Sequence, residues 1–368
     1  MWRLMGHVKL FIPGPIEVSQ KTLEAFAKPV IGHRSQAFKD MYARVEPRLQ
    51  QLFFTHQPVF LSTSSAWGVM EGSIRNLVNK KVLCCGNGAF SDKWLDVSLR
   101  CGKEAEGVKA EWGSPIRAEM IDAKLATGEF DALTFIHNET STGTQSPLAE
   151  LSEVKKKYPN VMFIVDTVSS MSGQKIAVDE LGFDVVLCGV QKALALPPGL
   201  ALFTVSEAAF ERAAQVKGRG YYFDFLEFRK NNDGNMTPST PVINHIYALE
   251  SKLDDIFTEG LEARYARHEK LAEMTRGWAT KHGFTLFPDE GYESVTLTCI
   301  NNGARPEKGG RVIDVPKFVK LVKERGFLIN GGYGKIKGTT FRVSNMGDET
   351  PETMNELFAA MDEAIGLL

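Results

Sequence analysis

The chain has few cysteines and almost no net charge, and each shortage argues against a class of protein. Five cysteines in 368 residues are an odd number, and none forms a C-x-x-C pair. This pattern argues against a disulfide framework or a zinc site and predicts reduced thiols, as in a cytosolic protein. The formal net charge is only −2. Such a balance gives no basic patch for nucleic acid and none for an acidic membrane surface, so we expect small-molecule partners.

The N-terminal sequence MWRLMGHVKLFIPGP also lacks the features of a targeting segment. It carries charges where a secretory signal needs apolar residues, and its prolines come early. We therefore expect neither a cleaved signal nor a membrane-spanning helix there, and we expect the protein in the cytoplasm. What the chain does contain is 43% apolar and 10% aromatic residues. That content is enough for one large core and a smaller one.

Short β-branched runs alternate with helical patterns through roughly the first half of the chain. The runs are PVFLST (58–63), KVLCCG (81–86), ALTFIH (132–137), VMFIVD (161–166) and DVVLCG (184–189). This alternation predicts an α/β fold with a mostly parallel sheet between helices. The next run, LALFTV (200–205), follows too soon for a crossover helix, so we expect it to pair antiparallel.

The second half predicts a smaller α+β domain. A helical pattern runs from about Val242 to His282, and three strand-like runs and a final helix follow it. These are TLTCI (296–300), FLINGG (327–332), TFRVSNM (340–346) and the helix 351–368, with Thr350 as N-cap and Pro351 at its first position. We assign residues 16–258 to the large domain, and residues 1–15 and 259–368 to the small one.

Ligands of open α/β sheets bind at the carboxyl ends of the strands, and two charged residues stand there. Asp166 ends VMFIVD, and burial would raise its pKa unless a cation faces it. On its own, such an Asp is also typical of a turn or a helix cap. Lys192 follows DVVLCG, and burial would lower its pKa and make it a nucleophilic amine. On its own, it could equally be a lysine that reaches out to water.

A third feature is TSSAWGVMEGSIRNLV (63–78), in which small residues lead from a strand into a helix that begins near Ser65 or Ala66. Free backbone N–H groups at such a start can bind phosphate, although an ordinary capped helix has the same pattern. In chain order, the three features supply what pyridoxal 5'-phosphate needs. These needs are a phosphate cradle, a carboxylate for the pyridinium nitrogen and a lysine that forms an imine.

Three motifs give the chain a family resemblance that runs nearly from end to end. HNETSTGTQSPL, FIVDTVSSMSG and GVQKALALPPGL resemble motifs of the fold-type I, class V aminotransferases. That group contains the alanine–glyoxylate and serine–glyoxylate (or pyruvate) aminotransferases. The resemblance implies a large domain of the seven-stranded type, pyridoxal 5'-phosphate as cofactor, no metal, and a homodimer.

The resemblance also implies a role for each matching residue. Lys192 would hold the cofactor as an imine, and Asp166 would pair with the ring nitrogen. Further cofactor contacts would come from Val168 and Phe90 on the ring, Thr140 near the ring oxygen, and Gln191 with the backbone of Ala66 and Trp67 at the phosphate. Many relatives have a Gly-rich sequence where this chain has Ala66 and Trp67.

Other matches concern the substrate and the partner subunit. Arg342, in GTTFRVSNMG, would grip the substrate α-carboxylate through two parallel hydrogen bonds, and Gly14 would touch the substrate. Without the other matches, Arg342 would be interpreted as a strand arginine in a surface ion pair. NMTPSTPVINHIYALE resembles the segment that reaches the partner subunit's phosphate site. The register there leaves Thr237, Ser239 and Thr240 open, and we choose Thr240. Arg34 would also serve the partner.

The implied reaction is transamination by a ping-pong mechanism, from alanine or serine to glyoxylate or pyruvate. A phosphoserine aminotransferase is an alternative, because those enzymes also carry a His-Arg pair similar to His33-Arg34, and Lys335 and Lys337 could supply charge. A lyase such as a cysteine desulfurase is disfavoured, since Phe90 replaces the usual histidine and Cys299 lies in a strand-like run. A non-catalytic partner subunit is disfavoured by the intact Lys192, Asp166 and Arg342.

Overall fold

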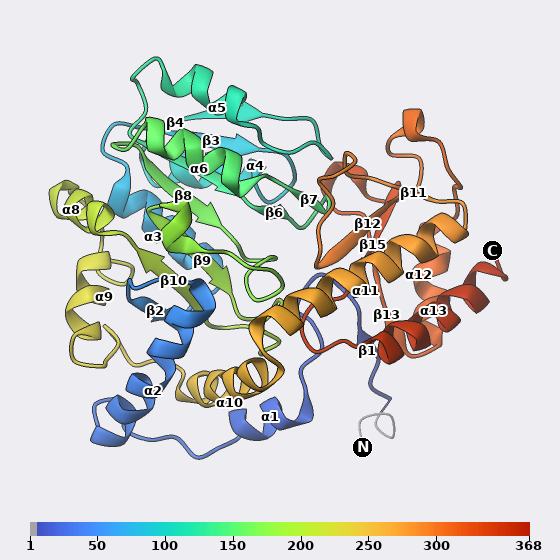
Figure 1. Ribbon diagram of the computed structural model, residues 1–368, viewed down its shortest axis with the longest axis horizontal. Helices are drawn as coiled ribbons and strands as arrows, with labels where there is room; N and C mark the ends of the chain where they lie inside the picture. The colour runs from blue at the N-terminus through green and yellow to red at the C-terminus, as the bar shows by residue number, and fades with distance from the viewer. Residues whose placement is uncertain (1–5) are drawn as a thin grey trace.

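The computed structural model describes residues 6–368, and the two largest of its β-sheets have seven and four strands (Figure 1). Residues 1–5 lie outside the described residues, so the expectation that no signal segment is present falls partly outside them. Within residues 6–368, no helix is long and apolar enough to cross a membrane. Cysteines 84, 85, 101, 188 and 299 are all free thiols, as expected.

The large sheet has the strand order β2-β10-β9-β8-β5-β3-β4. Its strands are β2 (Val59–Ser62), β3 (Lys81–Gly86), β4 (Glu104–Lys109), β5 (Ala132–Ile136), β8 (Met162–Asp166), β9 (Val185–Gly189) and β10 (Ala201–Val205). Strand β10 pairs antiparallel with both neighbours, and the other pairs are parallel. The expected α/β sheet and the antiparallel strand are therefore confirmed. Strand β4 escaped prediction because its sequence, EAEGVK, is polar and lies at the sheet edge.

Helices cover both faces of this sheet because alternate strand residues point to opposite sides. Leu133 and Phe135 pack into one core, and Ala132 and Ile136 pack into the other. The first core includes helices α2 (Gln36–Phe53), α5 (Ala118–Leu125), α6 (Leu148–Lys157) and α10 (Ile243–Glu259). The second includes α3 (Ala66–Leu77), α4 (Asp92–Arg100), α8 (Glu207–Gln215) and α9 (Phe225–Asn232).

Shorter elements complete the large unit. Helix α1 (Gln20–Phe26) lies against α10, and α7 (Val178–Leu181) lies near α6. Strands β6 (Asn138–Glu139) and β7 (Thr144–Gln145) form a small hairpin directly after β5. This hairpin carries the NETSTG motif to the edge of the large sheet that faces the small unit (Figure 1).

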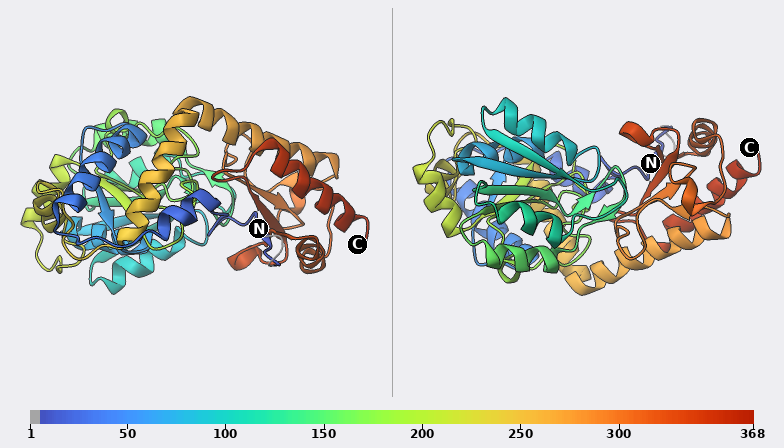
Figure 2. Two further views of the ribbon diagram at one scale, coloured as in Figure 1. Left: turned by 90° about the horizontal axis from the view of Figure 1, so that it is seen from below. Right: turned by 90° about the horizontal axis from the view of Figure 1, so that it is seen from above.

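The smaller unit is a four-stranded sheet with helices, and α11 extends to it from the large unit (Figure 2). Its elements are β11 (Thr285–Leu286), β12 (Leu297–Asn301), β14 (Asn330–Gly331), β15 (Thr340–Ser344), α11 (Leu261–Lys281), α12 (Val315–Glu324), α13 (Pro351–Ile365), and the 3-10 turns Pro306–Lys308 and Gly334–Ile336. Strand β1 (Lys9–Leu10) pairs in parallel with β13 (Phe327–Leu328), which brings the N-terminal segment to this unit. The proposed division at residue 258 stays a prediction.

Two expectations about the helices change. The prediction of one continuous helix from Val242 to His282 was wrong, because Gly260 separates α10 from α11. Its φ of 86° lies in the region that favours glycine, so the break has a local cause. The final helix ends at Ile365 rather than at residue 368, and Thr350 caps it with a reciprocal bond to Thr353, as the sequence predicts for its start.

Candidate active site

Asp166 and Lys192 come together at the carboxyl edge of the large sheet. Asp166 is the last residue of β8, Lys192 follows the end of β9, and these strands are parallel neighbours. Both side chains line a cavity of about 300 Å³. The two side chains lie close together because their strands are parallel neighbours, as their positions at the ends of these strands predicted.

The position of Asp166 is compatible with both roles considered from the sequence. Its Oδ1 accepts a hydrogen bond from the Val168 backbone N–H at 2.7 Å, so it does stabilise a turn. Its side chain is also buried and reaches the cavity. Burial is the main cause that raises its pKa to about 7; the nearby Glu139 adds to this, whereas the Val168 N–H and Lys192 oppose it. A cation in the cavity would keep this carboxylate ionised.

Lys192 is half-buried, and its ammonium meets the N-terminal segment. Its Nζ donates a hydrogen bond to the Pro13 carbonyl. A Cβ at position 14 would come within 2.7 Å of Nζ, so Gly14 leaves the space that Lys192 occupies. Burial, with help from Arg342, lowers the pKa of Lys192 to about 8, against the opposing effects of Asp166 and Glu139. Near neutral pH this amine is a better nucleophile than an ordinary lysine.

The start of helix α3 opens on the same cavity. Ser65 is its N-cap, yet the Ser65 side chain makes no capping hydrogen bond. Ser65, Ala66 and Trp67 all line the cavity, as does Gln191. Backbone N–H groups in the first turn of a helix that lacks a side-chain cap are suited to an anion such as phosphate. These residues therefore fit the phosphate of pyridoxal 5'-phosphate without a Gly-rich loop.

The remaining walls of the cavity suit an aromatic ring with polar substituents. Phe90, Val168 and Thr140 line it, as the sequence led us to expect. Asn138, from β6, also lines it and was not predicted. Its Oδ1 is buried without a hydrogen-bond partner among the described residues, so it is available to a donor on a ligand. Its place in the motif HNETSTGTQSPL, two residues before the predicted Thr140, was the available signal.

Arg342 lies in β15 and is only 4% exposed. Its Nη1 donates to the Thr140 carbonyl at 3.1 Å, while Nε and Nη2 donate to the Gly331 carbonyl at 3.3 and 3.2 Å. No carboxylate pairs with it among residues 6–368, so the alternative interpretation of Arg342 as part of a surface ion pair is wrong. Burial lowers its pKa. Arg342 does not itself line the cavity; it lies behind Thr140, whose carbonyl it holds.

Tyr333, which stacks on the predicted Phe90 next to Arg342, was missed in the sequence. Tyr333 stacks on Phe90 with ring centroids 5.2 Å apart and planes 3° apart. The Arg342 guanidinium lies 5.9 Å from the Tyr333 ring. A Cβ on Gly332 would come within 2.0 Å of the Ile336 carbonyl oxygen, so the tight loop needs glycine there. The sequence G-G-Y-G before a strand was the signal for an aromatic residue held in a fixed turn.

The residues proposed to serve a partner subunit lie elsewhere in this chain. Thr240 is exposed and its hydroxyl lies 3.4 Å from His33 Nε2, and Thr237 donates to the Ser239 carbonyl at 2.7 Å. Arg34 is exposed. None of the four lines the cavity of its own chain. Their contact with a partner's phosphate site stays a prediction.

Comparisons with known proteins agree over nearly the whole chain. The family model for class-V aminotransferases matches residues 80–314. An uncharacterised aminotransferase of Methanocaldococcus jannaschii is 36% identical over 92% of this chain and 87% of its own length. Serine–glyoxylate aminotransferase of Methylorubrum extorquens is 31% identical over 96% and 89%. The crystal structure of an alanine–glyoxylate aminotransferase from Nostoc sp. has a TM-score of 0.90 at 26% identity, and covers 98% of this chain and 95% of that one.

Proposed function

This chain belongs to the class-V aminotransferases, which are pyridoxal-phosphate-dependent enzymes of fold type I, and we propose that it moves the amino group of alanine or serine to glyoxylate or pyruvate. The observation that carries this proposal is the meeting of three groups. Lys192 and Asp166 line one cavity, and the buried Arg342 beside it has no carboxylate partner among the described residues. The binding of cofactor and amino acid requires an amine, a carboxylate and a guanidinium that is not already paired with a protein carboxylate.

Each part of pyridoxal 5'-phosphate has a matching group in the cavity. We infer that the start of α3 and Gln191 hold the phosphate, Asp166 holds the ring nitrogen, and Phe90 and Val168 flank the ring. Thr140 would lie near the ring oxygen, and the Asn138 Oδ1 would accept a hydrogen bond from that oxygen in its protonated form. When bound, the cofactor supplies an electron sink for the negative charge that develops at the substrate Cα.

The protein side chains then bind the substrate and move its proton. Arg342 would orient the α-carboxylate, and the Lys192 Nζ would take the Cα proton and release it again within the cavity. The pKa of Lys192, lowered to about 8, suits an amine that must both accept and donate near neutral pH. Asp166 would stay ionised opposite a protonated ring nitrogen, because that cation offsets the burial that otherwise raises its pKa.

The size of the cavity supports a small substrate. A volume of about 300 Å³ lies at the lower limit for ligand sites, and here cofactor and substrate must share it. Tyr333 and Phe90 further fill the space beside Arg342. The serine–glyoxylate and alanine–glyoxylate activities for which two similar proteins are named agree with this inference. We also propose a homodimer in which Thr240 reaches the phosphate site of the partner.

Neither alternative activity gains support from a specific contact. Lys335 lies over the Trp112 ring with its Nζ 4.4 Å from the centroid, and neither Lys335 nor Lys337 lines the cavity where a phosphoserine would bind. Cys299 is buried in β12, and burial raises its thiol pKa to about 12. A desulfurase needs a reactive, mobile thiolate, and this thiol is neither exposed nor ionised.

A half-reaction screen tests the proposal. The cofactor-loaded enzyme is mixed separately with alanine, serine, aspartate and phosphoserine, without a 2-oxo acid, and the visible absorbance of the bound cofactor is followed. We expect alanine or serine to bleach it, with release of one equivalent of the matching 2-oxo acid. The same screen on Lys192→Ala is the control. Bleaching by phosphoserine alone, or by none of the four, would contradict the proposal.

A further inference from the structure

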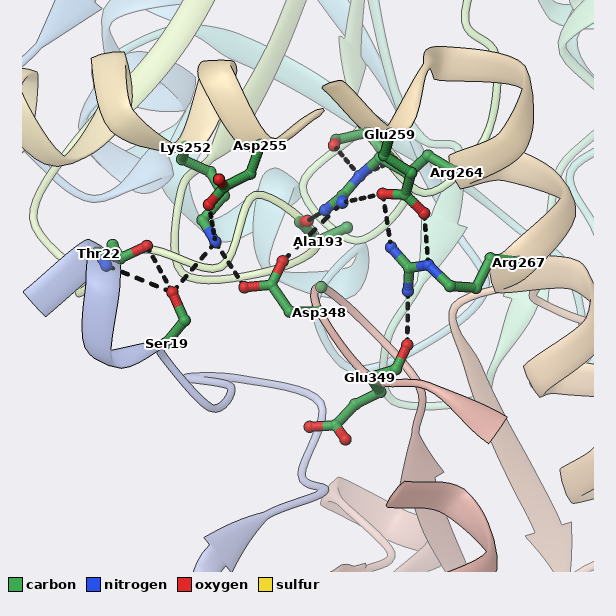
Figure 3. A network of polar contacts seen from close by, with 12 residues as sticks. Ser19, Thr22, Ala193, Lys252, Asp255, Glu259, Arg264, Arg267, Asp348 and Glu349 are labelled. Carbon is green, nitrogen blue, oxygen red and sulfur yellow. Dashed lines mark hydrogen bonds and ion pairs between the residues drawn. The ribbon is translucent and has the colours of Figure 1, made fainter. Parts of the chain in front are cut away.

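A network of buried charges lies where α10 meets α11 (Figure 3). Lys252 and Arg264 are at most 1% exposed. Lys252 pairs with Asp348, and its Nζ lies 3.6 Å from Asp255. Arg264 and Arg267 share the carboxylate of Glu259, at 3.1 and 2.6 Å. Buried cations of this kind persist only with such partners, so the network holds this junction together.

Arg264 uses each edge of its guanidinium for a different segment. Nε donates to the Ser172 carbonyl at 3.1 Å and to its hydroxyl at 3.0 Å. Nη2 donates to the Ala193 carbonyl at 2.7 Å. Nη1 pairs with Glu259 and lies 3.9 Å from the Asp348 carboxylate. A single side chain therefore joins three separate parts of the chain.

Two of these parts are the loops that carry the candidate catalytic groups. Ser172 belongs to the turns that follow β8 and Asp166, and Ala193 is the residue directly after Lys192. The backbone is strained at both places, since Ser172 has φ 72° and Ala195, whose N–H bonds to the Lys192 carbonyl, has φ 53°. Strained loops keep such conformations only where surrounding contacts hold them. Arg264 provides one of these contacts for both.

The third part connects to the arginine proposed to bind substrate. Asp348 lies in the segment 345–349 directly after β15, which carries Arg342. His268, one turn after Arg264, accepts the Gly347 N–H at 3.1 Å, and its carbonyl accepts the Asn345 side-chain amide at 2.9 Å. The first turns of α11 thus hold the Lys192 loop and the Arg342 strand at the same time.

We propose that Arg264 is a positioning residue, which fixes the backbone at Lys192 relative to Asp166 and to the Arg342 strand; this inference rests on the proposed role of Lys192. Its planar fork is essential to this role. A lysine would keep the positive charge but could not direct donors from three rigid edges toward Ser172, Ala193 and Glu259 at once.

The decisive variant is Arg264→Lys, with Arg267→Lys as the matched control. Arg267 also pairs with Glu259 and donates to the Glu349 carbonyl, but it bonds to neither site loop. In the loaded enzyme, we expect Arg264→Lys to lower kcat by about 10- to 100-fold, because small misplacements of a catalytic group have effects of this size. KM should change little, since Arg264 does not touch the cavity. Arg267→Lys should leave kcat unchanged.

A second measurement uses the cofactor-free protein and needs no turnover. The pH dependence of Lys192 acetylation, followed by mass spectrometry, reports the pKa of its amine. A loosened loop admits water, so the midpoint should rise from about 8 toward the ordinary lysine value of 10.5 in Arg264→Lys, but not in Arg267→Lys. This reading is independent of the substrate, so failure of the proposed transamination would leave it interpretable.

The results separate the possibilities. If Arg264→Lys folds and keeps both the kcat and the labelling midpoint of the control, Arg264 is structural only and the inference fails. If Arg264→Lys does not fold, Ser172→Ala removes one acceptor of Nε and should shift kcat and midpoint in the same directions by a smaller amount. Unchanged values in Ser172→Ala would then overturn the inference.

Discussion

The cavity and the α10–α11 junction both bury charged side chains, but they satisfy them differently. At the junction, Lys252 and Arg264 have carboxylate partners within 4 Å. Around the cavity, the shifted pKa values of Asp166 and Lys192 favour their neutral forms, and Arg342 bonds to carbonyl groups but to no carboxylate among residues 6–368. The buried cations of the junction are therefore balanced by nearby carboxylates, whereas the buried charged groups around the cavity are not.

The difference shows how a binding site can be recognised without its ligand. A compensated network already gains the energy that offsets burial, so it stabilises the fold. An uncompensated set costs stability until a ligand supplies the missing charges. Substitutions at the cavity should therefore raise stability or lower it only slightly, whereas those at the junction should lower it strongly, and the following predictions test this contrast from the largest expected effect to the smallest.

Lys192→Met should abolish transamination, with a loss of about 10³-fold or more, because it removes both the covalent link and the base. The cofactor-free variant should be more stable near neutral pH, by up to about 3 kcal/mol. The folded pKa of about 8 lies below the usual 10.5. Between these values the unfolded chain binds more protons, so wild-type stability rises with pH across this window and the variant lacks that slope. Urea unfolding of the wild type and the variant near pH 8 and pH 10.5 measures the difference in their free energies of unfolding. A variant less stable than the wild type at neutral pH would contradict the contrast between the cavity and the junction.

Arg342→Gln should lower kcat/KM for alanine by about 10²- to 10³-fold, because the substrate carboxylate loses a bidentate charged partner. Stability should fall only slightly, since no carboxylate is left unpaired. Steady-state kinetics and thermal unfolding measure the two quantities. Arg276→Gln is the control, because Arg276 also donates to carbonyl groups, those of Glu293 and Ser294, but neither of these residues lines the cavity, whereas the Arg342 partner Thr140 does. Equal kinetic losses in both variants would argue against the assignment of Arg342.

Asp348→Asn should lower the free energy of unfolding by roughly 3 kcal/mol, because the buried Lys252 loses its closest partner. Asp254→Asn, whose aspartate pairs with Arg48 and is 60% exposed, should change it by less than about 0.5 kcal/mol. Urea unfolding measures both. Similar values for the two variants would mean that the junction is not a compensated network of the kind described.

Tyr333→Ala should widen the site and raise kcat/KM for leucine relative to alanine by about tenfold, the usual size of a change in a small apolar pocket. Tyr333→Phe should retain the preference, because the stacked ring rather than the hydroxyl fills the space beside Arg342. Competition assays with both amino acids measure the ratio. An unchanged ratio in Tyr333→Ala would remove Tyr333 from the determinants of specificity.

The sequence predicts most of the large sheet and the centre of the cavity for the same reason. Parallel strands buried on both faces appear as apolar runs, and the residue that ends such a run lies at the edge where ligands bind. Asp166 and Lys192 were found in this way. Strand β4 was missed because an edge strand carries a polar sequence, and Gly260 was missed because one glycine does not interrupt a helical pattern.

The contacts that could not be predicted join distant parts of the chain. Arg264 and Ala193 are 71 positions apart, and Arg342 and Thr140 are 202 positions apart. Periodicity describes neighbours within one element and is silent about such pairs. Tyr333 and Asn138 were missed for the same reason, since their importance depends on Phe90 stacking in one case and on an unpaired amide oxygen in the other.

The pairing of β1 with β13 has a consequence for how the protein is made. Lys9 lies opposite Phe327, so the segment around Lys9 cannot join its sheet until residues 327–328 have been synthesised. Pro13 and Gly14, which lie against the Lys192 side chain, belong to that segment. Closing such a long loop costs conformational entropy before the contacts between the two strands can stabilise the chain, so this pairing is expected to form slowly. A nascent chain therefore completes this cavity only after residues 327–328 have been synthesised.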